Sequence, residues 1–390
     1  MPAAIEGGAE SDPELRVALF TGNYDYIKDG VALTLNRLVA YLQSQAVPVL
    51  VFAPTARLPA FESVGEVVSV PSIPIPSRSE YRISLGLPRK ARARLAEFRP
   101  SLFHIAVPDI LGYRALALGR RWNVPVVASY HTRYDTYLRY YGLGILETLG
   151  TRYLRWFYSR CRQVYPPSES MAAILREEGV TAEMRIWSRG IDSGLFDPRR
   201  RSPEWRRALG LSDEDVVVTY VGRLVKEKNT GLLARLFAEL ARGEPRLRGM
   251  IVGDGPEASA MKSALPGAVF TGFLHGEDLA RAYASADVFV FPSESETFGN
   301  VTLEAMASGL PAVCADASGS RSLVEEGETG FLARGNSEGE FIALIRRLVQ
   351  DDALRQRMGA AARKRALDFS WEKSLRGLHQ NYLEVLRAPV

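Results

Sequence analysis

The sequence is poor in residues that cross-link a chain or bind transition metals, and it contains no long apolar run. Its two cysteines, Cys161 and Cys314, lie far apart without metal-ligand spacing, so we expect neither a disulfide framework nor a zinc site. Apolar runs such as residues 47–53 are far shorter than the ~18 residues of a membrane-spanning helix. Residues 1–13 lack the apolar core of a signal peptide and predict a disordered tail. These absences predict a cytoplasmic protein.

The composition is that of a globular protein large enough for two domains. Of 390 residues, 46% are hydrophobic and 24% are charged, which suffices for two cores. Apolar runs of strand length alternate with helical patterns, which predicts an α/β fold with parallel, doubly wound sheets. The strands are expected near residues 16–20, 47–53, 66–70, 102–106, 124–130 and 163–166, and near 216–222, 248–252, 268–271, 288–291, 311–315 and 330–333.

The two series of strands predict two domains that face a central cleft. We expect the first domain over residues 14–190 and the second over residues 191–370. The linker is predicted near residues 190–205, which are rich in glycine, proline and charge. In open α/β sheets ligands bind beyond the carboxyl ends of the strands, so the site should lie in the cleft.

Residues 288–292 read as a buried strand, and the apolar spacing that follows predicts a helix from about Gly299 to Ser308. The first amides of such a helix lack partners and attract an anion through the helix dipole, which favours phosphate. Glu296 on the loop and Glu304 inside the helix could then accept hydrogen bonds from the hydroxyls of a phosphorylated sugar.

Two cations follow the first strand of the second series. Gly222 ends that strand, Arg223 comes next, and Lys228 follows five residues later. An arginine fork and a lysine point charge at a sheet edge would neutralise a diphosphate as it departs.

The pattern P-S-x-x-E-x-F-G-N-x-x-L-E-A-M-A-x-G-x-P-x-V over residues 292–313 resembles glycosyltransferase family 4, whose members have the GT-B fold of two Rossmann-like domains. The resemblance covers residues 15–388. It implies catalytic roles for His131, Arg223, Lys228 and Glu296, with Glu304 on the ribose of the nucleotide. It also implies that a last helix, over residues 371–388, returns to the first domain. The implied donor-binding residues are Gly30, Gly222, Asp254, Gly255, Phe298, Gly299, Asn300, Val301 and Glu304.

Two short motifs suggest other chemistry. Gly253, Gly255 and Ala258 fit the dinucleotide fingerprint of dehydrogenases, but they lie in mid-chain with Pro256 in the turn, and they match the V-G-D-G-P element of the family better. Asp213 and Asp215 have the D-x-D spacing of metal-dependent transferases, yet they precede their strand, where a turn role is expected. We therefore expect no metal and no organic cofactor.

In the first series, Gly30 and His131 each stand at the carboxyl end of a predicted strand. Gly30 matches the second glycine of the family's glycine-rich loop. Asp29 replaces a frequent glycine or asparagine there, and it is either a helix cap or a ligand contact. The resemblance places His131 near the donor sugar, where it would position and polarise, whereas His104 is expected to be structural.

Basic residues are concentrated in the first half of the chain. Residues 1–200 contain 25 Lys and Arg against 19 Asp and Glu, a net charge of +6, while the remainder carries −2. Residues 77–99 and 133–162 interleave arginine with aromatic side chains, which is typical either of core packing with solvated arginines or of a face resting on anionic lipid. The residues expected at an acceptor or membrane face are Tyr134, Arg139, Tyr140, Arg155 and Trp156.

The sequence thus predicts a retaining, metal-independent glycosyltransferase that moves a hexosyl unit from a nucleotide diphosphate sugar to a lipid or glycolipid hydroxyl. The resemblance is to lipid-modifying mannosyltransferases and sulfolipid synthases, so GDP-mannose is favoured as donor and the inner face of the cell membrane is an expected location. UDP-sugar donors, soluble or polysaccharide acceptors, an epimerase or phosphorylase activity and a purely binding function stay open. Alternating acidic and basic residues without a recognisable module argue against nucleic acid as a partner.

Overall fold

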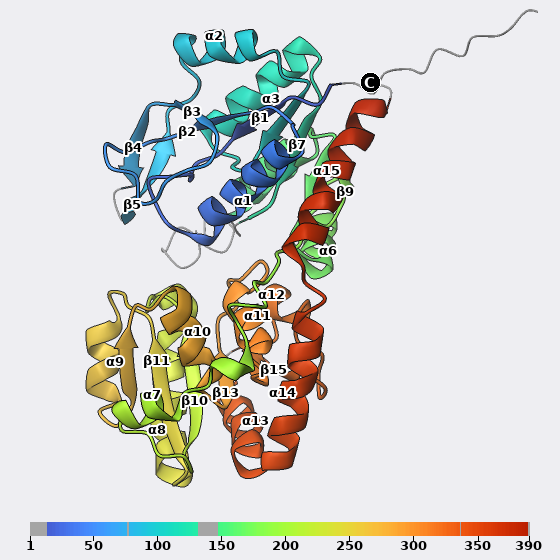
Figure 1. Ribbon diagram of the computed structural model, residues 1–390. Coiled ribbons are helices and arrows are strands. Elements are labelled where there is room, and N and C mark those ends of the chain that lie inside the picture. Colours follow the sequence, from blue (N-terminus) through green and yellow to red (C-terminus); the bar gives the residue numbers. More distant parts are fainter. Residues whose placement is uncertain (1–13, 76–77, 132–146, 336, 389–390) are drawn as a thin grey trace, which may run out of the picture.

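The computed structural model describes residues 14–75, 78–131, 147–335 and 337–388, which form two α/β domains joined by two passages of the chain (Figure 1). The first domain contains a seven-stranded parallel sheet with strand order β3-β2-β1-β6-β7-β8-β9. Its strands are β1 (Val17–Phe20), β2 (Val49–Ala53), β3 (Glu66–Ser69), β6 (Leu102–Ile105), β7 (Val126–Ser129), β8 (Gln163–Tyr165) and β9 (Glu183–Met184).

Both faces of this sheet are covered by helices, because alternate residues of its apolar strands point to opposite sides. On one face Phe20 and Phe52 pack with α2 (Arg89–Phe98), α3 (Ile110–Trp122), α5 (Glu147–Tyr158) and α6 (Glu169–Glu177). On the other face Leu19 and Val51 pack with α1 (Gly30–Ser44) and with α15 (Trp371–Arg387). The last helix of the chain therefore completes the core of the first domain, beside which Figure 1 shows it.

The second domain contains a six-stranded parallel sheet with strand order β12-β11-β10-β13-β14-β15. Its strands are β10 (Val216–Val221), β11 (Leu247–Val252), β12 (Val269–Gly272), β13 (Val288–Phe291), β14 (Ala312–Ala315) and β15 (Gly330–Ala333). Its helices are α7 (Pro203–Ala208), α8 (Thr230–Gly243), α9 (Ala258–Ala264), α10 (Gly276–Ala284), α11 (Asn300–Ala307), α12 (Ser318–Arg321), α13 (Glu338–Gln350) and α14 (Asp352–Ala366), with 3₁₀ turns η2 (Pro198–Arg200) and η3 (Lys226–Lys228). Every strand predicted from the sequence is present, and the GT-B fold is confirmed.

The two segments that connect the domains are in direct backbone contact with each other. Ile191 forms a bridge with Ser370, and its amide donates to the Phe369 carbonyl at 2.9 Å. A methyl group on Gly190 would lie 2.2 Å from the amide nitrogen of Trp371, so only glycine fits at this crossing.

The predicted linker over residues 190–205 is too long. Arg201 donates to the Ala286 carbonyl at 2.8 Å, and its guanidinium lies 2.9 Å from the Asp287 carboxylate. These contacts attach the second half of that segment to the second domain, because its arginines find carbonyl and carboxylate partners there.

Two further elements were not predicted. An antiparallel hairpin of β4 (Ser72–Ile75) and β5 (Arg78–Ser84) stands outside the main sheet, and β9 adds a two-residue strand at its edge. Pro74 interrupts the strand pattern of the hairpin, and two residues are too few to give a periodic signal.

The close approach of Gly190 to Trp371, here called the hinge, predicts opposite effects of two glycine substitutions on stability. Gly190→Ala should lower the free energy of unfolding by about 1–3 kcal/mol, since its methyl group meets backbone that must move. The control is Gly377→Ala within α15, where no atom lies within 4 Å of the added methyl and stability should rise by a few tenths of a kcal/mol or more. Urea unfolding of both variants measures this, and equal effects would contradict the close contact at the hinge.

Candidate active site

Two helix N-termini meet across the interdomain cleft. A methyl group on Gly30, the first residue of α1, would lie 3.2 Å from Nδ2 of Asn300, the first residue of α11. Asp29 is the N-cap of α1, since its carboxylate accepts from the Ala32 amide at 2.8 Å and from Nδ2 of Asn23 at 2.8 Å. The positive ends of two helix dipoles thus converge on one place, which favours an anionic ligand there.

The predicted cations stand at the same edge, after β10. Nζ of Lys228 pairs with the Glu296 carboxylate and lies 3.2 Å from Oγ of Ser295. The Arg223 guanidinium, 44% exposed, lies 4.0 Å from the buried Glu227 carboxylate. Burial raises the pKa of Asp29, and the charge of Arg223 is among the influences that oppose this rise. A basic pair is thereby held beside the two helix ends.

Backbone packing explains the glycines of residues 253–255. A methyl group on Gly253 would lie 2.0 Å from the carbonyl oxygen of Gly222, and one on Gly255 would lie 2.4 Å from that of Leu224. Between them Asp254 is exposed and accepts from the Gly255 amide at 2.8 Å. The G-x-G spacing therefore serves a close contact between two loops, and this contact brings Gly222, Asp254 and Gly255 together.

The start of α11 has the form that the sequence predicts, shifted by one residue. Gly299 adopts a left-handed conformation with φ 96°, and within the described residues no side chain caps the helix. Phe298 is buried and packs edge-to-face on Phe369, while Val301 is partly buried. This packing fixes the start of the helix.

Glu304, on the second turn of α11, is not a solvated helix residue. Its Oε2 accepts from the Tyr283 hydroxyl at 3.0 Å. Burial raises the pKa of Glu304 to about 7, while the Tyr283 hydrogen bond and the charge of Arg37 oppose the rise. The carboxyl group is therefore poised between its neutral and ionised forms near neutral pH, and Arg37 approaches it from the first domain.

His131 is buried at the junction of the domains. Nη2 of Arg189 donates to Nδ1 at 2.6 Å, and Nε2 lies 2.7 Å from Oγ of Ser129. Burial and the charge of Arg189 hold the pKa of His131 well below its ordinary value, so the ring is neutral. Its backbone carbonyl accepts from Oγ1 of Thr297 at 3.0 Å. Both ring nitrogens are thus bound within the protein, and the proximity of His131 to the donor sugar stays a prediction.

Further contacts between the domains come from residues that the sequence did not single out. Oγ of Ser170 donates to the Ser318 carbonyl at 2.5 Å, and Oγ of Ser168 donates to the Thr297 carbonyl at 3.4 Å. Isolated serines carry no pattern by which they could have been found.

The acids of the D-x-D motif lie at the opposite sheet edge, where the Asp215 carboxylate accepts from the Ser212 amide at 2.6 Å in a turn.

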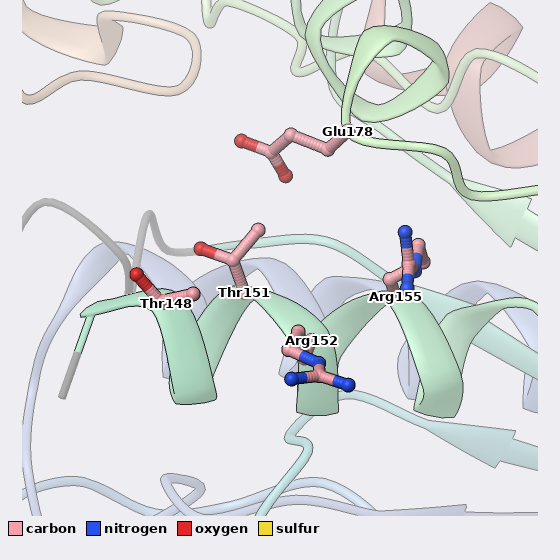
Figure 2. A pocket seen from close by; sticks show the side chains of 5 residues that line it. All are labelled: Thr148, Thr151, Arg152, Arg155 and Glu178. Atoms are coloured by element: carbon pink, nitrogen blue, oxygen red, sulfur yellow. The ribbon is translucent and has the colours of Figure 1, made fainter.

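The candidate acceptor face is carried by α5. Trp156 stacks on Tyr113 and Tyr153 with ring centroids 5.8 and 6.0 Å apart, and the Arg160 guanidinium lies over its ring. Exposed Arg155 lines an open pocket of about 260 Å³ together with Thr148, Thr151, Arg152 and Glu178 (Figure 2). Tyr134, Arg139 and Tyr140 lie outside the described residues. No helix in the described part of the chain is both long and apolar enough to cross a membrane.

The raised pKa of Glu304 predicts a pH-dependent stability. The folded protein holds this proton up to about pH 7, whereas the unfolded chain releases it near 4.5. Stability relative to Glu304→Gln should therefore be greatest below pH 4.5 and fall by up to about 3 kcal/mol as the pH rises past 7. Urea unfolding of both proteins at pH 5 and pH 8 measures the difference, and a flat difference would refute the assignment.

Two family models match the chain, Glycosyltransferase Family 4 over residues 28–195 and Glycosyl transferases group 1 over residues 201–365. The chain is 34% identical over 366 residues to the sulfoquinovosyl transferase SQD2 of Arabidopsis thaliana, which covers 91% of this chain and 71% of that protein. It is 33% identical over 377 residues to a GDP-mannose-dependent alpha-mannosyltransferase of Corynebacterium glutamicum, which covers 95% of this chain and 89% of that protein.

Weaker similarity extends to two other proteins. An alpha-monoglucosyldiacylglycerol synthase of Streptococcus pneumoniae is 27% identical over 311 residues, covering 77% of this chain and 70% of that protein. The sucrose-phosphate synthase of Thermosynechococcus elongatus has a TM-score of 0.79 at 21% identity over 96% of this chain and 100% of that chain, which shows the shared fold. The family match, the relatives and the two facing parallel sheets agree: the chain belongs to glycosyltransferase family 4 and is a hexosyltransferase with the GT-B fold.

Proposed function

We propose that this enzyme transfers a hexosyl unit, with retention and without a metal or organic cofactor, from a nucleotide diphosphate sugar to a hydroxyl of a lipid or glycolipid. GDP-mannose is our first candidate for the donor. The observation that carries the proposal is the convergence of Arg223, Lys228 and the starts of α1 and α11 at one cleft edge. Such a set of cationic and amide donors suits a diphosphate leaving group.

The reaction breaks the bond between the anomeric carbon and the diphosphate oxygen and forms a bond from that carbon to the acceptor oxygen. In our proposal Arg223, Lys228 and the first amides of α11 stabilise the charge that develops on the leaving diphosphate. The acceptor attacks on the face from which the leaving group departs, and the departing phosphate oxygen takes the acceptor proton. The pairing with Glu296 orients Lys228, and Glu304 accepts hydrogen bonds from ribose hydroxyls.

The identity of the sugar is open to a direct test. The Corynebacterium relative bears the name of a GDP-mannose-dependent enzyme, while the Arabidopsis and Streptococcus relatives are named for sulfoquinovosyl and glucosyl products. Calorimetric titration with GDP and UDP in EDTA, followed by transfer assays with the matching sugars, separates these donors. Tight GDP binding supports mannosyl transfer, UDP preference favours the second group, and binding of neither overturns the proposal. Release of an altered sugar without any acceptor would indicate an epimerase.

Removing the basic pair should remove the leaving-group site. Two charged hydrogen bonds are lost in Arg223→Ala with Lys228→Ala, so nucleotide diphosphate affinity should fall at least about 100-fold and turnover with it. The control is Lys226→Ala, an exposed lysine in the same 3₁₀ turn, which should leave both unchanged. Full turnover by the double variant would contradict the proposed mechanism.

A lipid acceptor requires the enzyme to reach a membrane surface, and α5 offers such a face. Leu149 is 60% exposed on this helix, Arg152 and Arg155 are exposed, and the Trp156 stack lies alongside. Aromatic rings suit the interfacial zone of a bilayer and arginines suit anionic headgroups. We therefore propose peripheral contact with anionic lipid through α5.

Vesicle binding tests this contact. Arg152→Ala with Arg155→Ala should lower partitioning onto phosphatidylglycerol vesicles by about tenfold or more, because each cation near the surface contributes about 1 kcal/mol. The matched control is Arg242→Ala with Arg357→Ala, which removes the same charge from exposed positions of the second domain. Equal losses in the two double variants would mean that net charge alone governs binding.

A further inference from the structure

A chain of buried hydrogen bonds runs from His131 to the last helix. Oγ of Ser129 lies 2.7 Å from Nε2 of His131 and 2.8 Å from Nε2 of His104. Nδ1 of His104 lies 2.5 Å from the hydroxyl of Tyr382 on α15. With Arg189 at the other end, all five side chains are buried, and those of His104 and Tyr382 are fully buried. The bond between His104 and Tyr382 is a tertiary contact, because the two residues are 278 positions apart in the sequence.

The chemistry of the end group sets the direction of every bond in this chain. Arginine can only donate, so Nδ1 of His131 accepts and its Nε2 carries the proton. His131 then donates to Ser129, Ser129 donates to Nε2 of His104, and Nδ1 of His104 donates to Tyr382. Burial lowers the pKa of His104 to about 3, which agrees with two neutral rings. Each histidine is therefore restricted to one tautomer.

The two ends of this hydrogen-bond chain belong to the two segments that meet at the hinge. Arg189 precedes Gly190 at the hinge, and Tyr382 belongs to the helix that begins at the hinge with Trp371. His131 itself touches the second domain, where its carbonyl binds Thr297, the residue after Glu296. Arg189 from one segment and Tyr382 from the other thus hold His131, the residue on which the Glu296 loop docks.

We propose that His104 and Tyr382 are positioning residues for His131: through Ser129 they hold its ring, in the tautomer that Arg189 sets, and thereby hold the backbone carbonyl on which the Glu296 loop docks. The inference rests on the proposed function, in which Glu296 orients Lys228 at the leaving diphosphate. It adds that the C-terminal helix acts on the reaction through buried groups that touch neither donor nor acceptor.

The kinetic test compares two tyrosines of the same core. Tyr382→Phe removes the acceptor at the end of the chain, whereas Tyr165→Phe removes an equally buried hydroxyl that binds Gln163 at 2.9 Å and has no part in the chain. The rings of Tyr165 and Tyr382 lie 6.0 Å apart, so packing effects are matched. We expect kcat to fall about tenfold in Tyr382→Phe, with the donor KM changed less than about twofold, and neither constant to change in Tyr165→Phe.

A double-mutant cycle shows whether the effect passes through His131. If it does, Tyr382→Phe causes no further loss of kcat in a His131→Ala background, because the imidazole ring through which it acts is absent. An additive loss, or equal kcat for Tyr382→Phe and Tyr165→Phe in an active enzyme, overturns the inference.

Nitrogen-15 NMR gives a readout that needs no turnover, because the sequence contains only four histidines. We expect His131 as the Nε2–H tautomer and His104 as the Nδ1–H tautomer. Tyr382→Phe should shift the Nδ1 resonance of His104, whose acceptor is lost, and Tyr165→Phe should leave it unchanged. If no donor and acceptor pair reacts with the wild-type enzyme, the proposed function fails, and the NMR comparison still decides the arrangement. Identical spectra in the two variants overturn it.

Discussion

The backbone contact between the two interdomain passages is the constraint on which the site depends. Ile191 pairs with Ser370 and Phe369, and Gly190 lies directly against Trp371. Each sheet is parallel, so all of its strands present their carboxyl ends at one edge. Fixing the passages side by side turns those two edges toward each other. Residues that are remote in sequence, such as Gly30 and Asn300, thereby come into contact.

Charge at this contact is balanced within the protein before any ligand arrives. Lys228 is paired with Glu296, and Arg223 stands near Glu227. A cation held by a carboxylate keeps its geometry, and a diphosphate with two negative charges competes well for it. Within α11, burial raises the pKa of Glu304 to about 7, and its carboxyl group accepts a hydrogen bond from Tyr283. The proposed donor site is therefore organised and only weakly charged, which limits the cost of bringing the domains together.

The sequence predicted the structure best where the signal lies within a single strand or a short motif. Strands such as β10 and β13 are fully buried apolar runs, and the E-x₇-E spacing with Arg223 and Lys228 was sufficient to locate the cleft edge. It was silent where the partner is distant. Nothing near His104 indicates Tyr382, and nothing near Arg189 indicates His131, because such pairs form only after the chain has folded. The glycines at 253 and 255 show a third case, in which a familiar spacing has a packing cause.

The position of α15 also affects how the molecule is assembled during synthesis. Leu375, Leu378, Tyr382 and Val385 complete the face of the first sheet formed by residues such as Leu19 and Val51. A chain emerging from the ribosome makes that face first and its cover last. Throughout translation of the second domain, an apolar surface of the first stays open to other proteins, including chaperones. The domain that begins folding earliest is thus the last to become complete.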